Sequence, residues 1–477
     1  MFKGAFALAV VFVLAIVSSL SACTIAVVHG SITTDGRPLL WKNRDVPDLE
    51  QEVRYFDTKP YGFLALVYCG ETDRAWAGIN DAGFGIVNSN SYNLPDSVIY
   101  GVDDGVIMWL ALKNCQTVDD FEVLISRTPP CNGYNFAVLD ANGNCAIFEA
   151  GPHTIHRIDL SPRLPYVVRS NFSFSGDSTR RTGIHRYTRA RYLIERGMAN
   201  GNLNYKYIID TVASDLFAPD LDPYPLPFEG FYRDFPRGFI PVNETISRFI
   251  TRAGIIIRGS QSRDRVSDGS MIVVMGQPVL GVPVCVWVRT KAVPRALLGY
   301  SPSSLCYQAE LIRRTIEPYS EFPNRFDTYR FVSIQPALQA LRLFAYETID
   351  MLDDFPAQEL RLQQDAVGNE IMSRYASFLP LSTGKEGFTP QDPYVNCYPN
   401  PFNSALNIKI GLAKSDEADI IILNMEGQIV QHLVAKTNSS VIWDGVSLKG
   451  EPAGSGLYIV RVKTGDWVKE EKVLFLK

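Results

Sequence analysis

Runs of apolar and β-branched residues, separated by turn-forming positions, recur along the first 300 residues and predict strands. Thr24–Val28 is one such run, and turn formers between positions 34 and 38 separate it from a second, Leu39–Asp45. A hairpin is therefore predicted close to the amino end. Further strands are predicted over residues 134–149 (two strands across an Asn-Gly turn), 167–172, 251–259, 269–275 and 282–288.

Residues 301–380 show apolar positions at helical spacing instead. Helices are predicted over Leu305–Ile316 and Leu360–Leu379. A third is predicted to start after Pro336, with one apolar face made of Leu338, Leu341, Ala345, Ile349 and Leu352. No catalytic constellation is visible in this segment. We expect a helical extension packed on the core, with a lid or a dimer surface as the alternative.

The carboxyl-terminal part of the chain predicts a separate all-β unit. Residues 381–396 are polar and rich in turn formers, which is typical of a linker. Residues 397–477 carry short strand-forming runs at the spacing of a small Ig-like β-sandwich. These predicted strands cover residues 405–410, 418–423, 429–434, 441–443, 456–462 and 469–476.

The amino end has the pattern of a secretory signal peptide over residues 1–22. Lys3 precedes the apolar run Ala5–Val17, and small residues follow up to Cys23. The apolar run is shorter than the roughly 20 residues that a membrane-spanning helix needs. The mature protein is therefore predicted to be exported and to begin at Cys23, with a core domain over residues 23–300.

Two interpretations of Cys23 are open. Leu20-Ser21-Ala22-Cys23 fits a lipoprotein box, in which the thiol and the α-amine are both acylated. Alternatively, cleavage after Ala22 leaves an unmodified amino-terminal cysteine. Lipoproteins usually have a flexible tether after the modified residue, whereas here a strand is predicted from Thr24 onward. This hairpin leaves no slack for an anchor and favours the unmodified terminus.

An amino-terminal cysteine holds both groups that amide cleavage requires. Its thiol attacks a carbonyl, and its α-amine, with an ordinary pKa of about 7.7–8.0, accepts and returns the proton. On the second strand, Lys42 would supply positive charge and Asp45 would bind the α-ammonium. They are three residues apart, so a bulge or the strand end must bring both to the site. The alternative is a surface pair on a hairpin.

The segments around these residues resemble the N-terminal-nucleophile hydrolases. The resemblance rests on Cys23-Thr24, on Lys42-Asn43-Arg44-Asp45, and on Gly-Ile-Asn-Asp-Ala-Gly-Phe-Gly from residue 78 with Asn90 beyond it. The groups it favours are choloylglycine hydrolase, penicillin V acylase and the acyl-CoA:6-aminopenicillanate acyltransferase family, over roughly residues 23–295. It implies an α+β fold with a four-layer αββα core, two antiparallel sheets lying between helices.

The same resemblance implies roles for individual residues. Cys23 falls on the nucleophile and Asp45 on the aspartate that binds its amine, while Lys42 stands where many members carry arginine. Asn90 falls on an oxyanion-hole asparagine. Asn171, at the end of the strand over 167–172, is placed beside the substrate amide. Arg186 matches the arginine of an Arg-aromatic stretch; on spacing alone it would be a solvated arginine of an amphipathic helix.

Three motifs near the carboxyl end resemble another family. Tyr398-Pro399-Asn400-Pro401-Phe402-Asn403, Trp443-Asp444-Gly445 and the segment 454–458 are similar to the sorting domain of the type IX secretion system. They also resemble the related Ig-like module of flagellar hook-capping proteins. The first resemblance implies export across an outer membrane, with the type IX machinery as partner and the protein either secreted or held at the surface.

Composition and short motifs bear on whether the protein binds nucleic acid, metal ions or cofactors. The 477 residues carry a net charge of -5 and no long basic run, which gives no support to nucleic-acid binding. None of the five histidines lies in a metal-binding motif, and no phosphate-binding glycine loop occurs, so we expect neither metal nor cofactor. The eight cysteines include one candidate disulfide pair, Cys115 with Cys131.

The sequence therefore predicts an exported amino-terminal cysteine hydrolase. Its substrate would be a linear amide, a small molecule or short peptide, cleaved through a thioester, with acyl transfer as a variant. The catalytic candidates are Cys23, Lys42, Asp45, Asn90, Asn171 and Arg186. The alternative is a lipidated surface binding protein on an inactive core. The sequence leaves the acyl group, the amine group and the oligomeric state open.

Overall fold

The computed structural model describes most of the predicted core and sandwich. The residues described are 22–94, 101–217, 239–260, 263–317, 324–379, 394–398, 402, 405–411, 417–436, 440–465 and 467–475. Residues 1–21 of the predicted signal peptide and 381–393 of the predicted linker lie outside them.

The first of two large sheets has six antiparallel strands and contains the predicted hairpin. The strand order is β10-β1-β2-β12-β13-β14. The hairpin strands have the predicted bounds, because the β-branched run and the turn formers define both ends. The strands are β1 (Thr24–Val28), β2 (Leu39–Asp45), β10 (Tyr166–Arg169), β12 (Thr251–Arg258), β13 (Ser270–Met275) and β14 (Pro283–Trp287).

The second large sheet is an antiparallel meander of seven strands that follow one another in sequence. Gly143, with φ of 83°, makes the tight turn between its fifth and sixth strands. The strands are β3 (Gln51–Phe56), β4 (Phe63–Tyr68), β5 (Ala77–Asn80), β6 (Gly85–Asn90), β7 (Tyr134–Leu139), β8 (Cys145–Ala150) and β9 (Ile155–Asp159).

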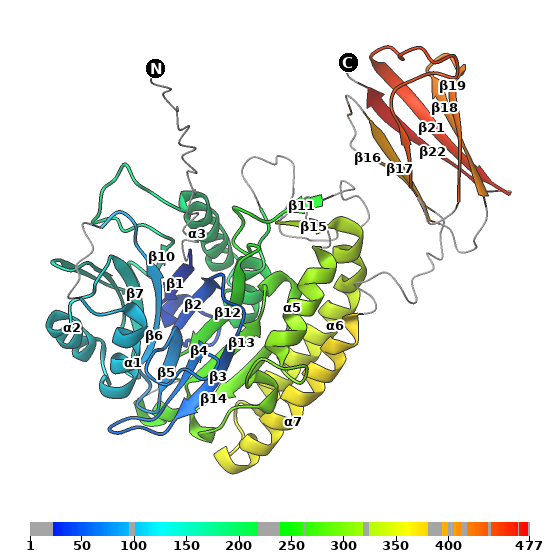
Figure 1. Cartoon of the computed structure of the whole chain (residues 1–477). Coiled ribbons are helices and arrows are strands. Elements are labelled where there is room, and N and C mark those ends of the chain that lie inside the picture. The colour runs from blue at the N-terminus through cyan, green and yellow to red at the C-terminus, as the bar shows by residue number, and fades with distance from the viewer. Residues whose placement is uncertain are drawn as a thin grey trace, which may run out of the picture.

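Three apolar clusters show that the two sheets pack face to face between helices (Figure 1). One cluster lies between the sheets. A second lies between the six-stranded sheet and α3 (Ile184–Ala199), the short α4 (Tyr205–Tyr207) and the π-helical turn Ile208–Ala213. The third lies between the seven-stranded sheet and α1 (Asp104–Asn114) and α2 (Val118–Arg127). The predicted four-layer αββα core is thus confirmed.

The helices α5 (Leu305–Ile316), α6 (Thr328–Leu352) and α7 (Ala357–Ala376) pack on these layers and contribute to the same clusters. The prediction that the middle helix starts after Pro336 was wrong, because this proline lies inside α6. Asp327 caps the helix by accepting a hydrogen bond from the Arg330 amide at 3.0 Å. Burial of the first turns in the core offsets the hydrogen bond that proline removes.

The end of α6 is tied to the six-stranded sheet by one carboxylate. Asp353 accepts hydrogen bonds from Arg37, just before β2, at 2.9 Å and from Arg258 of β12 at 2.5 Å. The indole of Trp287 in β14 donates a third, at 2.7 Å. Three strands of the sheet that carries the hairpin are thus joined to one point on the helical layer.

The carboxyl-terminal strands form a sandwich of a three-stranded and a four-stranded sheet around Trp443 and Phe475. The predicted all-β unit is confirmed, but its first strand begins inside the segment predicted as linker, where a flanking proline obscures so short a run. The strands are β16 (Tyr394–Tyr398), β17 (Leu406–Gly411), β18 (Glu417–Asn424), β19 (Ile429–Lys436), β20 (Ser440–Trp443), β21 (Gly456–Thr464) and β22 (Trp467–Phe475).

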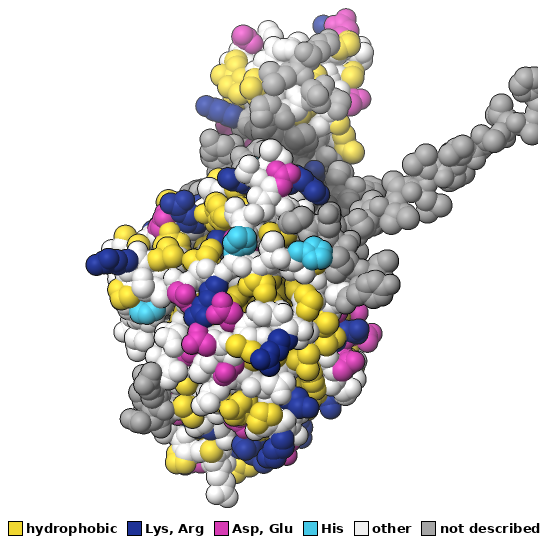
Figure 2. Space-filling view, turned by 90° about the vertical axis from the view of Figure 1, so that its left-hand side faces the viewer, with side chains coloured by type: hydrophobic (Ala, Val, Ile, Leu, Met, Phe, Trp, Pro, Cys, Tyr) yellow, Lys and Arg dark blue, Asp and Glu magenta, His cyan; other side chains and the backbone are white. Residues whose placement is uncertain are grey.

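Two further observations concern the surface and the cysteines. On the face shown in Figure 2, basic and acidic side chains are interspersed rather than gathered by sign. Within the described ranges, no helix is long and apolar enough to cross a membrane. The predicted disulfide between Cys115 and Cys131 was wrong. Both are thiols: Cys115 is buried beneath α2, and Cys131 contacts the Tyr134 hydroxyl at 3.6 Å.

Candidate active site

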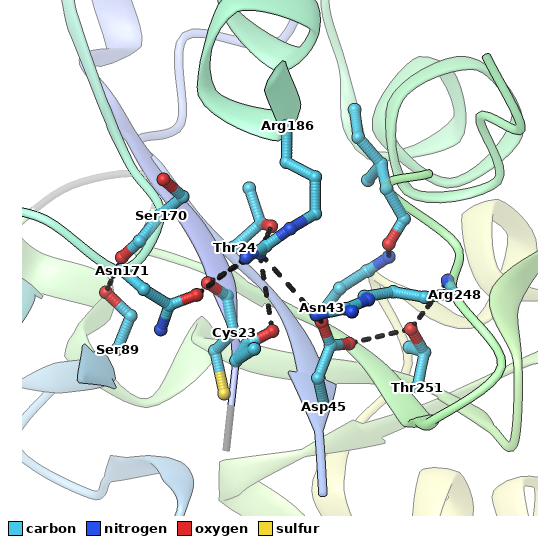
Figure 3. Close-up of polar contacts among 12 residues, drawn as sticks. Cys23, Thr24, Asn43, Asp45, Ser89, Ser170, Asn171, Arg186, Arg248 and Thr251 are labelled. Carbon is cyan, nitrogen blue, oxygen red and sulfur yellow. Dashed lines mark hydrogen bonds and ion pairs between the residues drawn. The ribbon is translucent and has the colours of Figure 1, made fainter. Parts of the chain in front are cut away.

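Cys23 lies directly before β1 and is 5% exposed. The Ala22 amide donates to the Asp45 carbonyl at 3.1 Å, so the β1–β2 ladder continues past its last assigned pair, Thr24 with Asn43. In this register Cys23 stands opposite Arg44. Side chains alternate along a strand, and Ile25 lies in the cluster between the sheets. The thiol therefore points between the sheets, and Figure 3 shows its sulfur directed away from Arg186.

Arg186 joins the backbone around Cys23 to the predicted site residues from the opposite face (Figure 3). It lies on α3, and its side chain is fully buried. Nη1 donates to the carbonyls of Ala22 at 3.3 Å and Cys23 at 3.1 Å and to the Thr24 hydroxyl at 2.7 Å. Nη2 donates to Oδ1 of Asn171 at 2.7 Å. Burial lowers the pKa of this guanidinium, while Asp45 nearby opposes that shift.

Asp45 ends β2 and is fully buried beside this arginine. Its Oδ1 accepts a hydrogen bond from the Thr251 hydroxyl at 2.7 Å. Its Oδ2 lies 3.9 Å from Arg186 and 3.8 Å from Arg248, and has no hydrogen-bond partner among the described residues. Burial raises the pKa of this carboxyl to about 6, although both arginines oppose the shift. One carboxylate oxygen is thus available to a further donor.

The two predicted asparagines meet where the two sheets come together. Asn171 follows β10 of the six-stranded sheet, and its Nδ2 donates to the carbonyl of Asn90 at 3.1 Å. Asn90 ends β6 of the seven-stranded sheet and is partly exposed. The Asn171 carbonyl in turn accepts from the Tyr92 amide at 3.0 Å. Asn90 therefore reaches the cluster through its backbone, and Asn171 through its side chain.

Lys42 lies on the face of β2 opposite to Asp45. Its buried ammonium donates to the Trp76 carbonyl at 2.8 Å and to Oδ1 of Asn88 at 2.5 Å. Nδ2 of Asn88 in turn donates a hydrogen bond to the Asp104 carboxylate at 2.5 Å, so Asn88 bridges Lys42 and Asp104. Burial lowers the pKa of Lys42 to about 8, and the charge of Cys23 is the strongest opposing influence. Lys42 and Asp45, which are three residues apart, therefore reach the site from opposite faces of β2, and no bulge is needed between them.

Sequence reasoning missed several residues that hold the cluster together. Thr251 reaches Asp45 because β12 has an irregular register between Thr251 and Ala253. The amide of Asn43 donates to the carbonyls of Ala213 and Ile246, which anchors the loop that carries Arg248. Nothing in the local sequence marks these contacts, since they depend on pairing between strands some 200 residues apart. Within the described ranges, no group of three or more histidine, cysteine or acidic residues is arranged to hold a metal ion.

Two antiparallel sheets lie between helical layers, with Cys23 directly before the first strand, as the predicted resemblance to N-terminal-nucleophile hydrolases implies. Residues 32–179 match the model of the acyl-coenzyme A:6-aminopenicillanic acid acyl-transferase family, which confirms the predicted resemblance over that segment. Lys42, Asp45, Asn90 and Asn171 lie inside the match; Cys23 and Arg186 lie outside it. No curated protein sequence matches the chain.

The carboxyl-terminal resemblance is also confirmed. Residues 396–475 match the model of the secretion system C-terminal sorting domain. This domain indicates export by the type IX system, followed by secretion or attachment at the cell surface. Latent PorU from Porphyromonas gingivalis is 22% identical to the chain over 19% of its length and 10% of PorU, with a TM-score of 0.17.

Solved structures similar to the core include a variant of conjugated bile acid hydrolase from Clostridium perfringens. It is 12% identical to the chain, with 53% of this chain and 89% of the hydrolase covered and a TM-score of 0.35. Penicillin V acylase from Agrobacterium tumefaciens is 13% identical, with 56% and 85% covered and a TM-score of 0.33.

Proposed function

We propose that the protein is an exported amidohydrolase of the amino-terminal cysteine type, with Cys23 as its nucleophile. The observation that carries this proposal is the contact network around residue 23. Arg186 donates to the carbonyl of Cys23, the residue predicted to become the amino terminus, and it also contacts Asn171 and Asp45, so three predicted site residues are joined beside Cys23. The match to an acyl-transferase family supports the broader class of amide hydrolases and acyltransferases.

In the proposed reaction, Sγ of Cys23 attacks the carbonyl carbon of an amide while the α-amine takes the thiol proton. The tetrahedral intermediate collapses, the C–N bond breaks, and the α-ammonium returns the proton to the leaving nitrogen. A thioester remains. Water then attacks the thioester, with the α-amine again as base, and releases the acid and the thiol. Attack by a second amine in place of water would give acyl transfer.

The unpartnered oxygen of Asp45 supplies the acceptor that this mechanism needs. Cleavage after Ala22 turns the Cys23 amide into an amine at the end of the β1–β2 ladder, next to the position where Ala22 pairs with Asp45. An ammonium there would bind Oδ2, which lies among arginines and has no hydrogen bond among the described residues. Thr251 holds the other carboxylate oxygen and fixes its direction. Asp45 is thus proposed to orient the amine.

Stabilisation of the oxyanion is assigned to the asparagines, and stabilisation of the thiolate to Lys42. Asn171 donates one N–H of its side-chain amide to the Asn90 carbonyl, and its second N–H can donate to the developing negative charge on the oxyanion. Arg186 holds Asn171 in place through Oδ1. Lys42 lies on the thiol's face of the sheet and favours the thiolate by its charge. The Asn90 side chain completes the proposed oxyanion site.

The test is a measurement on the exported protein and on two variants. Intact mass and amino-terminal sequencing should show a chain that begins with unmodified Cys23. A panel of N-acyl amides should be hydrolysed, and Cys23→Ser should lower kcat by at least about 1000-fold while the circular dichroism spectrum stays unchanged. Cys145→Ser, at a buried thiol of β8 outside the site, is the matched control and should keep the activity.

Other outcomes would contradict the proposal. A diacylglycerol adduct on Cys23 would block both reactive groups and would point to a lipidated surface binding protein on an inactive core. Undiminished activity in Cys23→Ser would place the nucleophile elsewhere. The burial of Cys23 directly before β1 argues against lipidation, because a membrane anchor needs a tether between the lipid and the fold.

A further inference from the structure

A buried polar pair interrupts the apolar face of the seven-stranded sheet that is packed against the six-stranded sheet. Val87 of β6 and Ala137 of β7 lie in the cluster between the two sheets. Side chains two residues apart on a strand share a face, so Ser89 and Asn135 continue these two rows. They stand opposite each other in the β6–β7 ladder, and neither is more than 1% exposed. Polar groups buried at such a position are costly unless their hydrogen bonds are made.

Both side chains hold the segment after β10, which carries Asn171. Nδ2 of Asn135 donates to the carbonyl of Phe172 at 3.3 Å and to the Ser89 hydroxyl at 3.2 Å. The Ser89 hydroxyl donates in turn to the carbonyl of Ser170 at 2.7 Å, and Nδ2 of Asn135 lies 3.5 Å from that same oxygen. Figure 3 shows Ser89 beside Ser170 and Asn171. The carbonyls on either side of Asn171 are thus held by the opposite sheet.

The amide of Asn135 is fixed from its other end as well. Its Oδ1 accepts a hydrogen bond from the Ser173 hydroxyl at 2.7 Å. The same hydroxyl lies 2.7 Å from that of Ser91, and the Ser173 amide donates to Oδ1 of Asn93 at 2.8 Å. None of these side chains is more than 4% exposed. Asn135 therefore cannot rotate without breaking hydrogen bonds at both ends of its amide.

Asn171 depends on this support because the strand ladder ends before it. β10 is an edge strand, and its last pair in the β1–β10 ladder is Arg169 with Ile25. Arg186 and the Asn90 carbonyl hold the side-chain amide of Asn171, but the position of that amide follows the backbone. A displacement of about 1 Å in a stabilising group can lower a rate about 100-fold.

We propose that Asn135 is a positioning residue of the reaction: it holds the backbone on both sides of Asn171 and so sets the direction in which the second N–H of Asn171 meets the oxyanion. This inference rests on the proposed function. It assigns no contact between Asn135 and the substrate. Loss of Asn135 should therefore slow the steps that form an oxyanion, and should leave substrate binding and the reactivity of the Cys23 thiol nearly unchanged.

The experiment uses Asn135→Ala in the mature full-length protein and the N-acyl amide that the wild type hydrolyses fastest. The kcat should fall about 30- to 100-fold, while KM stays within about threefold of the wild-type value. The inhibition constant of the aldehyde that corresponds to the acyl group should rise by a similar factor, because its adduct with Sγ of Cys23 also places an oxygen at the oxyanion site. Alkylation of Cys23 by iodoacetamide forms no oxyanion, so its rate should stay within about threefold.

Asn80→Ala is the matched control. Asn80 lies on β5 of the same sheet and is also 0% exposed. Its Nδ2 donates to the carbonyls of Leu112 at 2.9 Å and Cys115 at 2.7 Å, away from the site. Both substitutions remove a buried amide that satisfies backbone carbonyls, so both should lower the melting temperature by similar amounts. Only Asn135→Ala should lower kcat. An equal fall of kcat in the two variants, or a rise of KM in place of that fall, would overturn the proposal.

Ser89→Ala is the milder variant and decides the matter if Asn135→Ala does not fold. It removes a single hydroxyl, which holds the carbonyl of Ser170 and accepts from Asn135. It should lower kcat about 3- to 10-fold with the same unchanged KM. A folded Ser89→Ala variant with the wild-type kcat would count against the proposed support of Asn171.

Hydrogen exchange separates this proposal from the proposed function, because it needs no substrate. The amide of Tyr92 donates to the Asn171 carbonyl at 3.0 Å, so its exchange rate reports on the backbone of Asn171. This rate should rise about 10-fold in Asn135→Ala and not in Asn80→Ala. If the wild type hydrolyses no amide but this difference appears, the hydrolase proposal fails while the support of Asn171 by Asn135 stands. Unchanged exchange at Tyr92 in folded Asn135→Ala would refute the positioning role.

Discussion

The buried carboxyl of Asp45 predicts opposite effects of one substitution before and after cleavage at Cys23. In the uncut chain, burial raises the pKa of Asp45 from 3.8 to about 6. A carboxyl whose folded-state pKa is raised contributes stability at low pH that is lost as the pH rises through the folded value. At one pKa unit per 1.36 kcal/mol, ionisation costs the uncut fold about 3 kcal/mol. A neutral asparagine side chain in its place would avoid this cost and still accept the Thr251 hydrogen bond.

The perturbation is Asp45→Asn in two versions of the protein, one that retains residues before Cys23 and one that begins at Cys23. In the uncut version the advantage of the variant over wild type should rise from about 1 kcal/mol at pH 4.5 to about 3 kcal/mol at pH 7.5. The larger value corresponds to a shift on the order of 5 °C for a core of this size. In the cut version the α-ammonium supplies the missing partner of Oδ2. There the same substitution should destabilise the protein by about 1–3 kcal/mol at pH 7.5.

Differential scanning calorimetry at the two pH values measures the melting temperature of the core transition. The mass of each preparation must be checked, so that the uncut version is known to be uncut. Asp73→Asn, at an exposed position before β5, is the control and should show no pH-dependent difference. The reasoning is refuted if cut and uncut chains respond alike, because the amine would then not contact Asp45. It is also refuted if the difference in the uncut chain does not change with pH.

Three further predictions follow from neighbouring contacts. Burial lowers the pKa of Lys42 to about 8, so its charge is lost above that pH and kcat/KM should decline on the alkaline side. In a pH–rate profile from about pH 6 to 10, Lys42→Arg should move this decline to higher pH. Arg186→Met should lower kcat/KM by about 100-fold or more, because it removes the hydrogen bonds to Asn171 and to the backbone of Cys23. Arg186→Lys should restore part of the loss. Equal rates in both variants would rule out a charge-dependent role for Arg186. Trp443→Ala should destabilise the sandwich by about 3–5 kcal/mol and raise its sensitivity to protease, without changing kcat of the hydrolase core.

The sequence predicts well those elements whose limits are set by local chemistry. The strands Thr24–Val28 and Leu39–Asp45 and the helix Leu305–Ile316 have the predicted bounds, because turn formers and the Ser304 cap mark their ends. The start of α6 is different. There, burial of the turns before Pro336 outweighs the local preference of proline for a helix start. At this position tertiary packing therefore determines where the helix starts, and the local preference of proline does not.

In the candidate site, too, some residues can be predicted from the local sequence and others cannot. Cys23 and Asp45 can be proposed from the sequence because a predicted cleavage signal and a predicted strand end mark their positions. The placement of Arg44 opposite Cys23 follows from the hairpin register, which could in principle have been counted from the turn. Arg248 and Thr251 could not have been found this way, since their approach to Asp45 depends on the irregular pairing of β12 with β2. Long-range register carries no local signature.

The strand order of the six-stranded sheet bears on when the site can form. β1 pairs with β10, some 140 residues later, and β2 pairs with β12, more than 200 residues later. A chain that crosses a membrane amino end first therefore delivers the hairpin long before its flanking strands arrive, and non-local pairings of this kind are slow to form. The edge of β1 stays open until residues up to Arg169 have crossed, and the edge of β2 until residues up to Arg258 have crossed. The contacts that Arg186 and Thr251 make beside Cys23 and Asp45 can therefore form only after the segments up to β12 have arrived, so the proposed nucleophile lacks these partners until then.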